Sequence, residues 1–208
     1  MVSAVAVFQH PAATITTTFA GGNAFNGNMF DVEVFSQPIT VTGLTIHKMD
    51  TANATLEVYT KPGTYVGSES NSVPWQLGSS SSVTGAAGSD GSSTHGFGTF
   101  VDITDFSLAA SSTTELYITF TGAGGGPEDD ENIMNYTNGM NTFTNADLEL
   151  SLGVGKGNGG FSGRTVGSRT WNGTIHYSQV PEPSVLAGLF SLLGMSLFAT
   201  RWRNRHNK

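Results

Sequence analysis

Hydrophobic and polar residues alternate through most of the chain, in short runs separated by turn residues such as Gly, Pro, Asn and Ser. In residues 29–35, for example, Phe30, Val32 and Val34 fall on one face, and two acidic residues fall on the other. This period of two predicts half-buried β-strands, because successive side chains of a strand point to opposite faces. Similar runs cover residues 14–19, 39–46, 56–60, 75–77, 98–106, 115–121, 148–152 and 171–177.

About ten such strands, with no amphipathic helix among them, predict an all-β domain over residues 14–178. The expected architecture is an antiparallel β-sandwich. We favour a jelly-roll topology, and the sequence leaves an immunoglobulin-like strand order open. Two stretches rich in Ser and Gly, residues 68–72 and 78–94, are predicted as surface loops.

A different pattern occupies residues 179–208. Val180 and the Pro-Glu-Pro of Pro181, Glu182 and Pro183 precede 17 residues without a charge, 184–200, which contain no polar stripe. As a helix this run would be roughly 26 Å long, just enough for a bilayer core of about 30 Å, so it predicts a single C-terminal transmembrane helix. The basic end that follows marks the cytoplasmic side and places the preceding chain across the membrane. Its charged residues are Arg201, Arg203, Arg205 and Lys208.

The order of Pro-Glu-Pro, apolar run and arginine-rich end resembles the C-terminal sorting signal of bacterial PEP-CTERM proteins, over the last 29 residues. The resemblance implies export, membrane anchoring, and processing near the Pro-Glu-Pro by an exosortase. It also implies a final place at the cell surface or in a biofilm matrix with exopolysaccharide. The body is similar to a jelly-roll-like ectodomain found before such tails, in residues 19–22, 27–31, 56–59, 63–67, 75, 145–147, 155–157 and 171–176.

Charge and composition agree with a role outside the cytoplasm. Up to Gln179 the chain has 15 acidic and 5 basic residues, a net charge of −10, which argues against nucleic acid as a partner. There is no cysteine, so disulfides and thiol chemistry are excluded. Residues 1–13 are predicted as the remnant of a signal peptide or a leading segment, because their start is apolar but lacks a basic region.

Motifs for catalysis are missing from the sequence. There is no HExxH or Gly-x-Ser-x-Gly arrangement, and residues 153–160 lack the Ser or Thr that a phosphate loop needs after Lys156. We predict a glycine-rich hairpin loop there instead. The carboxylates that might form a glycosidase pair are placed by alternation on solvated strand faces. They are Asp31, Glu33, Glu57 and Glu115. The protein is predicted to be non-enzymatic, with a matrix-polymer hydrolase as a third alternative.

Two binding hypotheses remain open. Four carboxylates in one loop supply the oxygen ligands that Ca²⁺ accepts, but they lack the spacing of an EF-hand, and a solvated acidic turn is the favoured interpretation. They are Glu128, Asp129, Asp130 and Glu131. No other cofactor is expected.

The second hypothesis is a secreted carbohydrate-binding module, the main alternative to a surface protein without a specific ligand. β-Sandwich modules stack sugar rings on aromatic side chains. The candidates are Tyr59, Tyr65, Trp75 and Tyr136, each of which is also a plausible core residue. Trp171, at the start of a strand, is expected to pack inside.

Overall fold

The computed structural model describes residues 12–21, 23–48, 53–84, 98–121 and 134–180. Its one helical element in these ranges is the short 3₁₀ turn η1 (Gly160–Ser162). The strands are β1 (Ala13–Thr16), β2 (Asn23–Phe25), β3 (Gly27–Val34), β4 (Ile39–Ile46), β5 (Ala54–Pro62), β6 (Gln76–Val83), β7 (Thr99–Leu108), β8 (Ser112–Thr121), β9 (Met134–Asn138), β10 (Thr142–Thr144), β11 (Leu148–Lys156), β12 (Thr165–Gly167), β13 (Arg169–Trp171) and β14 (Gly173–Gln179).

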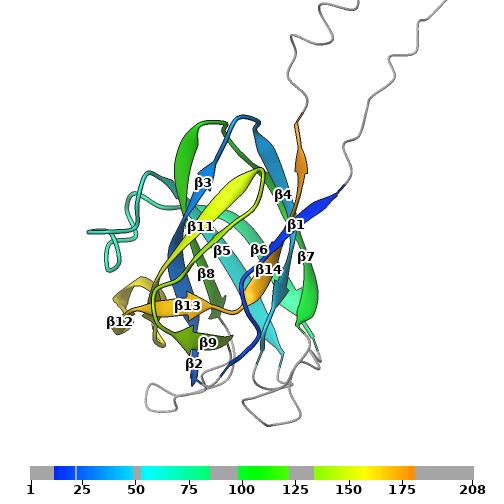
Figure 1. Ribbon diagram of the computed structural model, residues 1–208. Coiled ribbons are helices and arrows are strands. Elements are labelled where there is room, and N and C mark those ends of the chain that lie inside the picture. Colours follow the sequence, from blue (N-terminus) through cyan, green and yellow to red (C-terminus); the bar gives the residue numbers. More distant parts are fainter. Residues whose placement is uncertain (1–11, 22, 49–52, 85–97, 122–133, 181–208) are drawn as a thin grey trace, which may run out of the picture.

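The described strands form three sheets (Figure 1). The smaller main sheet has the order β1-β14-β4-β7, and the larger has the order β10-β11-β3-β8-β5-β6, with β12 paired to β11. A third sheet, β13-β9-β2, is short. All strand pairs are antiparallel. The predicted all-β, antiparallel sandwich architecture is therefore confirmed at this level.

The main core lies between the two main sheets. Phe30, Val32 and Val34 point inward from β3 and are at most 1% exposed, as the alternation predicted. Leucine, isoleucine and valine side chains of β4 and β14 meet them from the smaller sheet. Trp171 is fully buried, as expected, and its ring stacks on that of Phe30 at 5.4 Å between centroids. Each such large apolar side chain contributes roughly 1.5–3 kcal/mol on burial.

Both ends of the described domain lie at the same edge of the sandwich. β1 and β14 lie side by side (Figure 1), with Ala13 opposite Tyr177. The Val180 amide donates a hydrogen bond to the Pro38 carbonyl at 2.8 Å, next to the connection between β3 and β4. β3 begins at Gly27, at the opposite end of the sandwich. A strand of its length places Gly27 about 24 Å from Val34.

Two segments that the sequence predicted as loops are partly strands in the structure. β6 continues to Val83, through serines expected in a flexible loop, because Ser79 and Val83 face the interior and are 3% exposed. β11 continues to Lys156, so the hairpin-loop prediction is wrong for residues 153–156. Position 155 of this strand needs a glycine because the Phe25 ring packs where the Cβ atom of any other residue would lie.

The predicted transmembrane helix and the motif at residues 181–183 lie outside the described residues, as does most of the predicted leader, residues 1–11. Within the described ranges, no helix is both long enough and apolar enough to cross a membrane.

Candidate functional site

The outer face of the larger sheet, which points away from the main core, carries a row of apolar side chains across five strands. The registers place Val154, Met29, Tyr117, Tyr59 and Leu77 next to one another in this order. Directly paired residues share a face of a sheet, so these side chains form one continuous band. The band is buried at Met29 and Tyr117, half-buried at Tyr59, and 53% exposed at Leu77.

Two loops fold back over this band and build a second, aromatic core. The β5–β6 connection brings Tyr65 and Trp75, which are 8% exposed, and the loop after β11 brings Phe161. The Phe161 ring lies 5.0 Å from the Tyr117 ring and 5.1 Å from the Tyr59 ring, edge to face in both pairs. Such contacts hold each ring in a defined orientation.

Lys156 fixes the loop after β11. Its side chain is fully buried, and Nζ donates hydrogen bonds to the Phe161 carbonyl at 3.2 Å, the Gly163 carbonyl at 2.7 Å and the Thr165 hydroxyl at 2.7 Å. Burial lowers the pKa of Lys156, and the negative charge of Glu69 opposes this. Because its donors satisfy loop carbonyls, Lys156 positions Phe161.

Lys61 and Glu115 support the other loop. Lys61 Nζ donates to Glu115 Oε2 at 2.7 Å and to the Thr64 carbonyl at 2.6 Å. The Tyr65 amide donates to Asp31 Oδ1 at 3.1 Å. Glu115 was expected on a solvated face, but it is fully buried because this loop covers it. Burial raises the pKa of Glu115 to about 7, although the Lys61 ammonium acts in the opposite direction.

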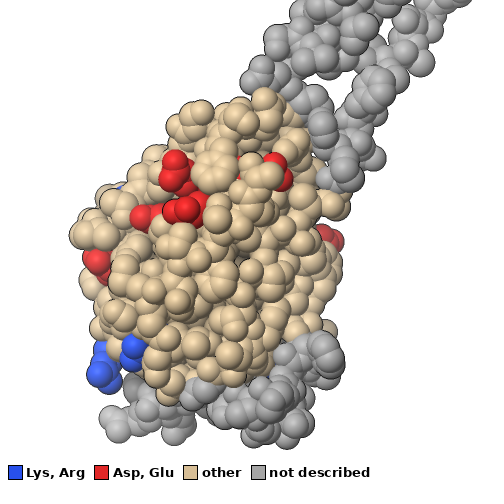
Figure 2. Space-filling model, viewed as in Figure 1, with Lys and Arg blue, Asp and Glu red and all other residues tan. Residues whose placement is uncertain are grey.

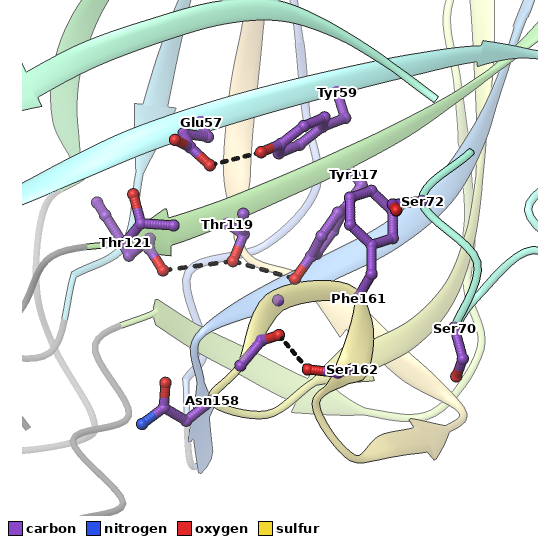
Figure 3. A pocket seen from close by; sticks show the side chains of 13 residues that line it. Glu57, Tyr59, Ser70, Ser72, Tyr117, Thr119, Thr121, Asn158, Phe161 and Ser162 are labelled. Carbon is purple, nitrogen blue, oxygen red and sulfur yellow. Dashed lines mark hydrogen bonds between the residues drawn. The ribbon is translucent and has the colours of Figure 1, made fainter. Parts of the chain in front are cut away.

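Between the two loops lies a cleft of about 520 Å³ (Figure 3). This volume falls within the range of roughly 300–1,000 Å³ that is typical of small-molecule sites. Strands β5 and β8 form one side, and the loop after β11 forms another. The cleft is lined by Glu57, Tyr59, Ser70, Ser72, Tyr117, Thr119, Phe120, Thr121, Asn158, Gly159, Gly160, Phe161 and Ser162.

The polar groups of the cleft include one carboxylate and several hydroxyls. Tyr59 Oη donates to Glu57 Oε2 at 2.7 Å, and Tyr117 Oη donates to Thr119 Oγ1 at 3.2 Å. Burial, with the nearby Glu57 carboxylate, raises the pKa of Tyr59 to about 12, so its phenol stays protonated at neutral pH. A carboxylate has about four acceptor positions, so Glu57 can accept further hydrogen bonds. No Lys or Arg is among the described lining residues.

The four tyrosine and tryptophan candidates for sugar stacking have different positions. Tyr59 lines the cleft. Tyr65 and Trp75 are buried beside it, so they belong to the core, the alternative that the sequence left open. Tyr136 is 4% exposed on β9, where it stacks on Phe25 in the third sheet, away from the cleft.

Other predicted site residues are not placed. The candidate calcium ligands, residues 128–131, lie outside the described residues, and the described ranges contain no cluster of three or more His, Asp or Glu side chains suited to a metal. Sequence reasoning did not propose Tyr117, Thr119 or Phe161. Alternation in residues 115–121 puts Tyr117 and Thr119 on the outer face. Nothing in the sequence signals Phe161, which reaches the cleft through the tertiary fold.

Comparison with known proteins identifies no family. No family model matches the chain, and no curated protein matches it. Among solved structures, the Gx strain of infectious bursal disease virus is similar at 13% identity and a TM-score of 0.27, over 90% of this chain and 47% of that one. The Gt strain gives 11% identity and a TM-score of 0.26, over 84% and 41%. The chain thus spans less than half of either viral chain, and similarity at this level carries no argument.

Proposed function

We propose that this protein is an exported, non-enzymatic bacterial surface protein, held in the inner membrane by its C-terminal helix until an exosortase processes it. The observation that carries the proposal is the order of three parts at the C-terminus: Val180 to Pro183, the uncharged run of residues 184–200, and the basic residues 201–208. After processing, the domain is delivered to the cell surface or to a polysaccharide matrix outside the cell.

The position of the domain ends supports a tethered display. The chain leaves the sandwich at Val180, beside the Pro38 carbonyl at one edge. The cleft lies toward the opposite edge, since Glu57 and Thr119 are in one register row with Gly27 and Lys156. A domain attached through its C-terminus therefore points its cleft away from the attachment.

The make-up of the cleft supports binding rather than hydrolysis. Glycoside hydrolysis uses two carboxylates about 5–9.5 Å apart. Glu57 is the one carboxylate among the described residues that line the cleft, and Tyr59 donates to it. Glu115, another carboxyl on the outer face of the larger sheet, is buried and paired with Lys61.

The strand order supports a jelly-roll-like topology as the finer form of this fold. Consecutive strands β3, β4 and β5 alternate between the larger and the smaller sheet, and β6, β7 and β8 do the same. Crossing between two packed sheets in this way is typical of Greek-key and jelly-roll sandwiches.

Cell fractionation tests the sorting role. The full chain is produced in its bacterium with and without the exosortase, and mass spectrometry locates its C-terminus in each fraction. We expect an intact, membrane-bound chain without the enzyme, and a chain ending near Pro181 to Pro183 outside the membrane fraction with it. Replacing Pro181, Glu182 and Pro183 by alanine should block processing, while Pro74→Ala, at an exposed loop proline, should not. An intact cytosolic chain in both strains would refute the proposal.

A further inference from the structure

We propose that the cleft between the β5–β6 loop and the loop after β11 binds an uncharged polysaccharide. Tyr59 and Phe161 contact a sugar ring, and Glu57 accepts hydrogen bonds from the sugar hydroxyls. This proposal deepens the proposed function. The biological source of the polysaccharide rests on that function, whereas the binding itself does not. It also gives the carbohydrate-binding alternative a defined site.

The aromatic side chains suit the apolar faces of sugar rings. Tyr59, Tyr117 and Phe161 line the cleft together and contact one another. Figure 3 shows the Tyr117 and Phe161 rings close together, with Tyr59 beside them on β5. Because these rings already hold one another in place, little side-chain entropy is lost when a ligand binds. Leu77 continues the apolar band outside the cleft, where a neighbouring sugar unit can pack.

The polar lining suits hydroxyl groups. The Glu57 carboxylate is half-buried at the edge of the aromatic cluster, and hydrogen bonds to an ionised acceptor are stronger than neutral ones. Hydroxyls and a side-chain amide also line the cleft, and these groups can donate as well as accept hydrogen bonds. They belong to Ser70, Ser72, Thr119, Thr121, Asn158 and Ser162. Each hydroxyl of a sugar can likewise donate and accept hydrogen bonds, so these groups match a sugar ligand.

Charge favours a neutral chain over an acidic one. The described lining has a carboxylate and no cationic side chain, so a uronate, sulfate or phosphate group would meet repulsion from Glu57. Lys156 lies in the same register row as Glu57. Its ammonium, however, donates hydrogen bonds to two loop carbonyls and the Thr165 hydroxyl. In Figure 2, most of the visible face is uncharged, a group of Asp and Glu side chains lies in its upper part, and its few Lys and Arg side chains lie along its left side.

Direct binding measurements test this site. The purified full chain is kept in a detergent without a sugar headgroup, because a maltoside could compete. Isothermal titration is then carried out with dextran, laminarin, a galactomannan and a mannan, and with alginate and hyaluronan as acidic counterparts. We expect at least one neutral polymer to bind, with little dependence on salt, and the acidic polymers to bind at least about tenfold more weakly.

Matched variants locate the binding. Glu57→Gln keeps the shape of the side chain and should weaken binding about tenfold or more, as expected for loss of a charged acceptor. Glu33→Gln makes the same change at an exposed position of β3 and should have no effect. Tyr59→Leu should abolish measurable binding, while Phe100→Leu, at a 57% exposed ring on the smaller sheet, should not. Circular dichroism checks that each variant is folded. If Tyr59→Leu does not fold, the comparison of Glu57→Gln with wild type decides the result.

Three outcomes would overturn the proposal: no binding of any of the four neutral polymers, a preference for the acidic polymers, or equal affinity of wild type and Glu57→Gln. Each is independent of sorting, because the purified chain is tested outside the cell. Failure of the exosortase experiment would leave this result intact, and failure of binding would leave the sorting result intact.

Discussion

Replacing Glu115 with glutamine is expected to remove a pH dependence of stability that originates beneath the β5–β6 loop. Glu115 is fully buried on β8, and Lys61 is its ion-pair partner at 2.7 Å. Asp31 lies opposite it on β3, and the charges of Asp31 and Glu69 add to the effect of burial. Glutamine keeps an oxygen for Lys61 but carries no charge and does not titrate.

The size of the effect follows from the pKa of Glu115, which rises from 4.5 to about 7 in the folded protein. Between these values the folded state binds more protons than the unfolded state, so stability falls as the pH rises. A rise of about 2.5 in pKa corresponds to roughly 3 kcal/mol, and most of this is lost between pH 5 and pH 8.

Urea unfolding, followed by tryptophan fluorescence, measures this difference. Wild type and Glu115→Gln are unfolded at pH 5 and at pH 8 under otherwise identical conditions. Relative to the variant, wild type should lose roughly 2–3 kcal/mol of unfolding free energy between these pH values. Glu33→Gln, on an exposed part of β3, serves as the control and should keep the wild-type pH dependence.

A difference between wild type and Glu115→Gln that is the same at both pH values would refute the reasoning. A wild type that gains relative stability at pH 8 would also refute it. The first result would mean that attraction to Lys61 balances the loss of hydration of the Glu115 carboxylate, and the second would mean that attraction outweighs it.

Three further substitutions probe the loops and the domain ends. Lys156→Met should destabilise the fold by about 2–4 kcal/mol and speed hydrogen exchange in residues 157–165, because three acceptors lose a charged donor; unchanged exchange would contradict this. Gly153→Ala should lower stability by about 1–3 kcal/mol in a thermal melt, because its Cβ would overlap the Tyr65 ring; an unchanged melt would count against this packing. Tyr177→Phe removes the hydrogen bond to Asp147 Oδ2 at 2.8 Å and should cost about 1–2 kcal/mol in urea unfolding. Burial raises the pKa of Tyr177 to about 12, so this loss should be constant from pH 5 to 8, and a pH-dependent loss would argue against it.

The alternation of apolar and polar residues was sufficient to predict most of the longer strands and their inward faces, but not β9 or the short strands β2, β10 and β12. Residues 39–46 were predicted as a strand and form β4 with the same bounds. Phe30, Val32 and Val34 were assigned to one face and all lie in the main core. These features are local, since the period of a strand is set by its own backbone. The C-terminal signal is also a local pattern, and its role remains a prediction.

Tertiary structure alone decided which outward positions are covered. Alternation puts Glu115 and Tyr117 on the outer face, but it cannot indicate that two loops, distant in the sequence, fold back over them. Phe161 reaches this face through a glycine-rich loop held by Lys156. The serines of β6 are in a strand because they pair with β5, despite their low strand propensity. Burial of an outward position depends on segments that local periodicity does not describe, and the cleft is made from such segments.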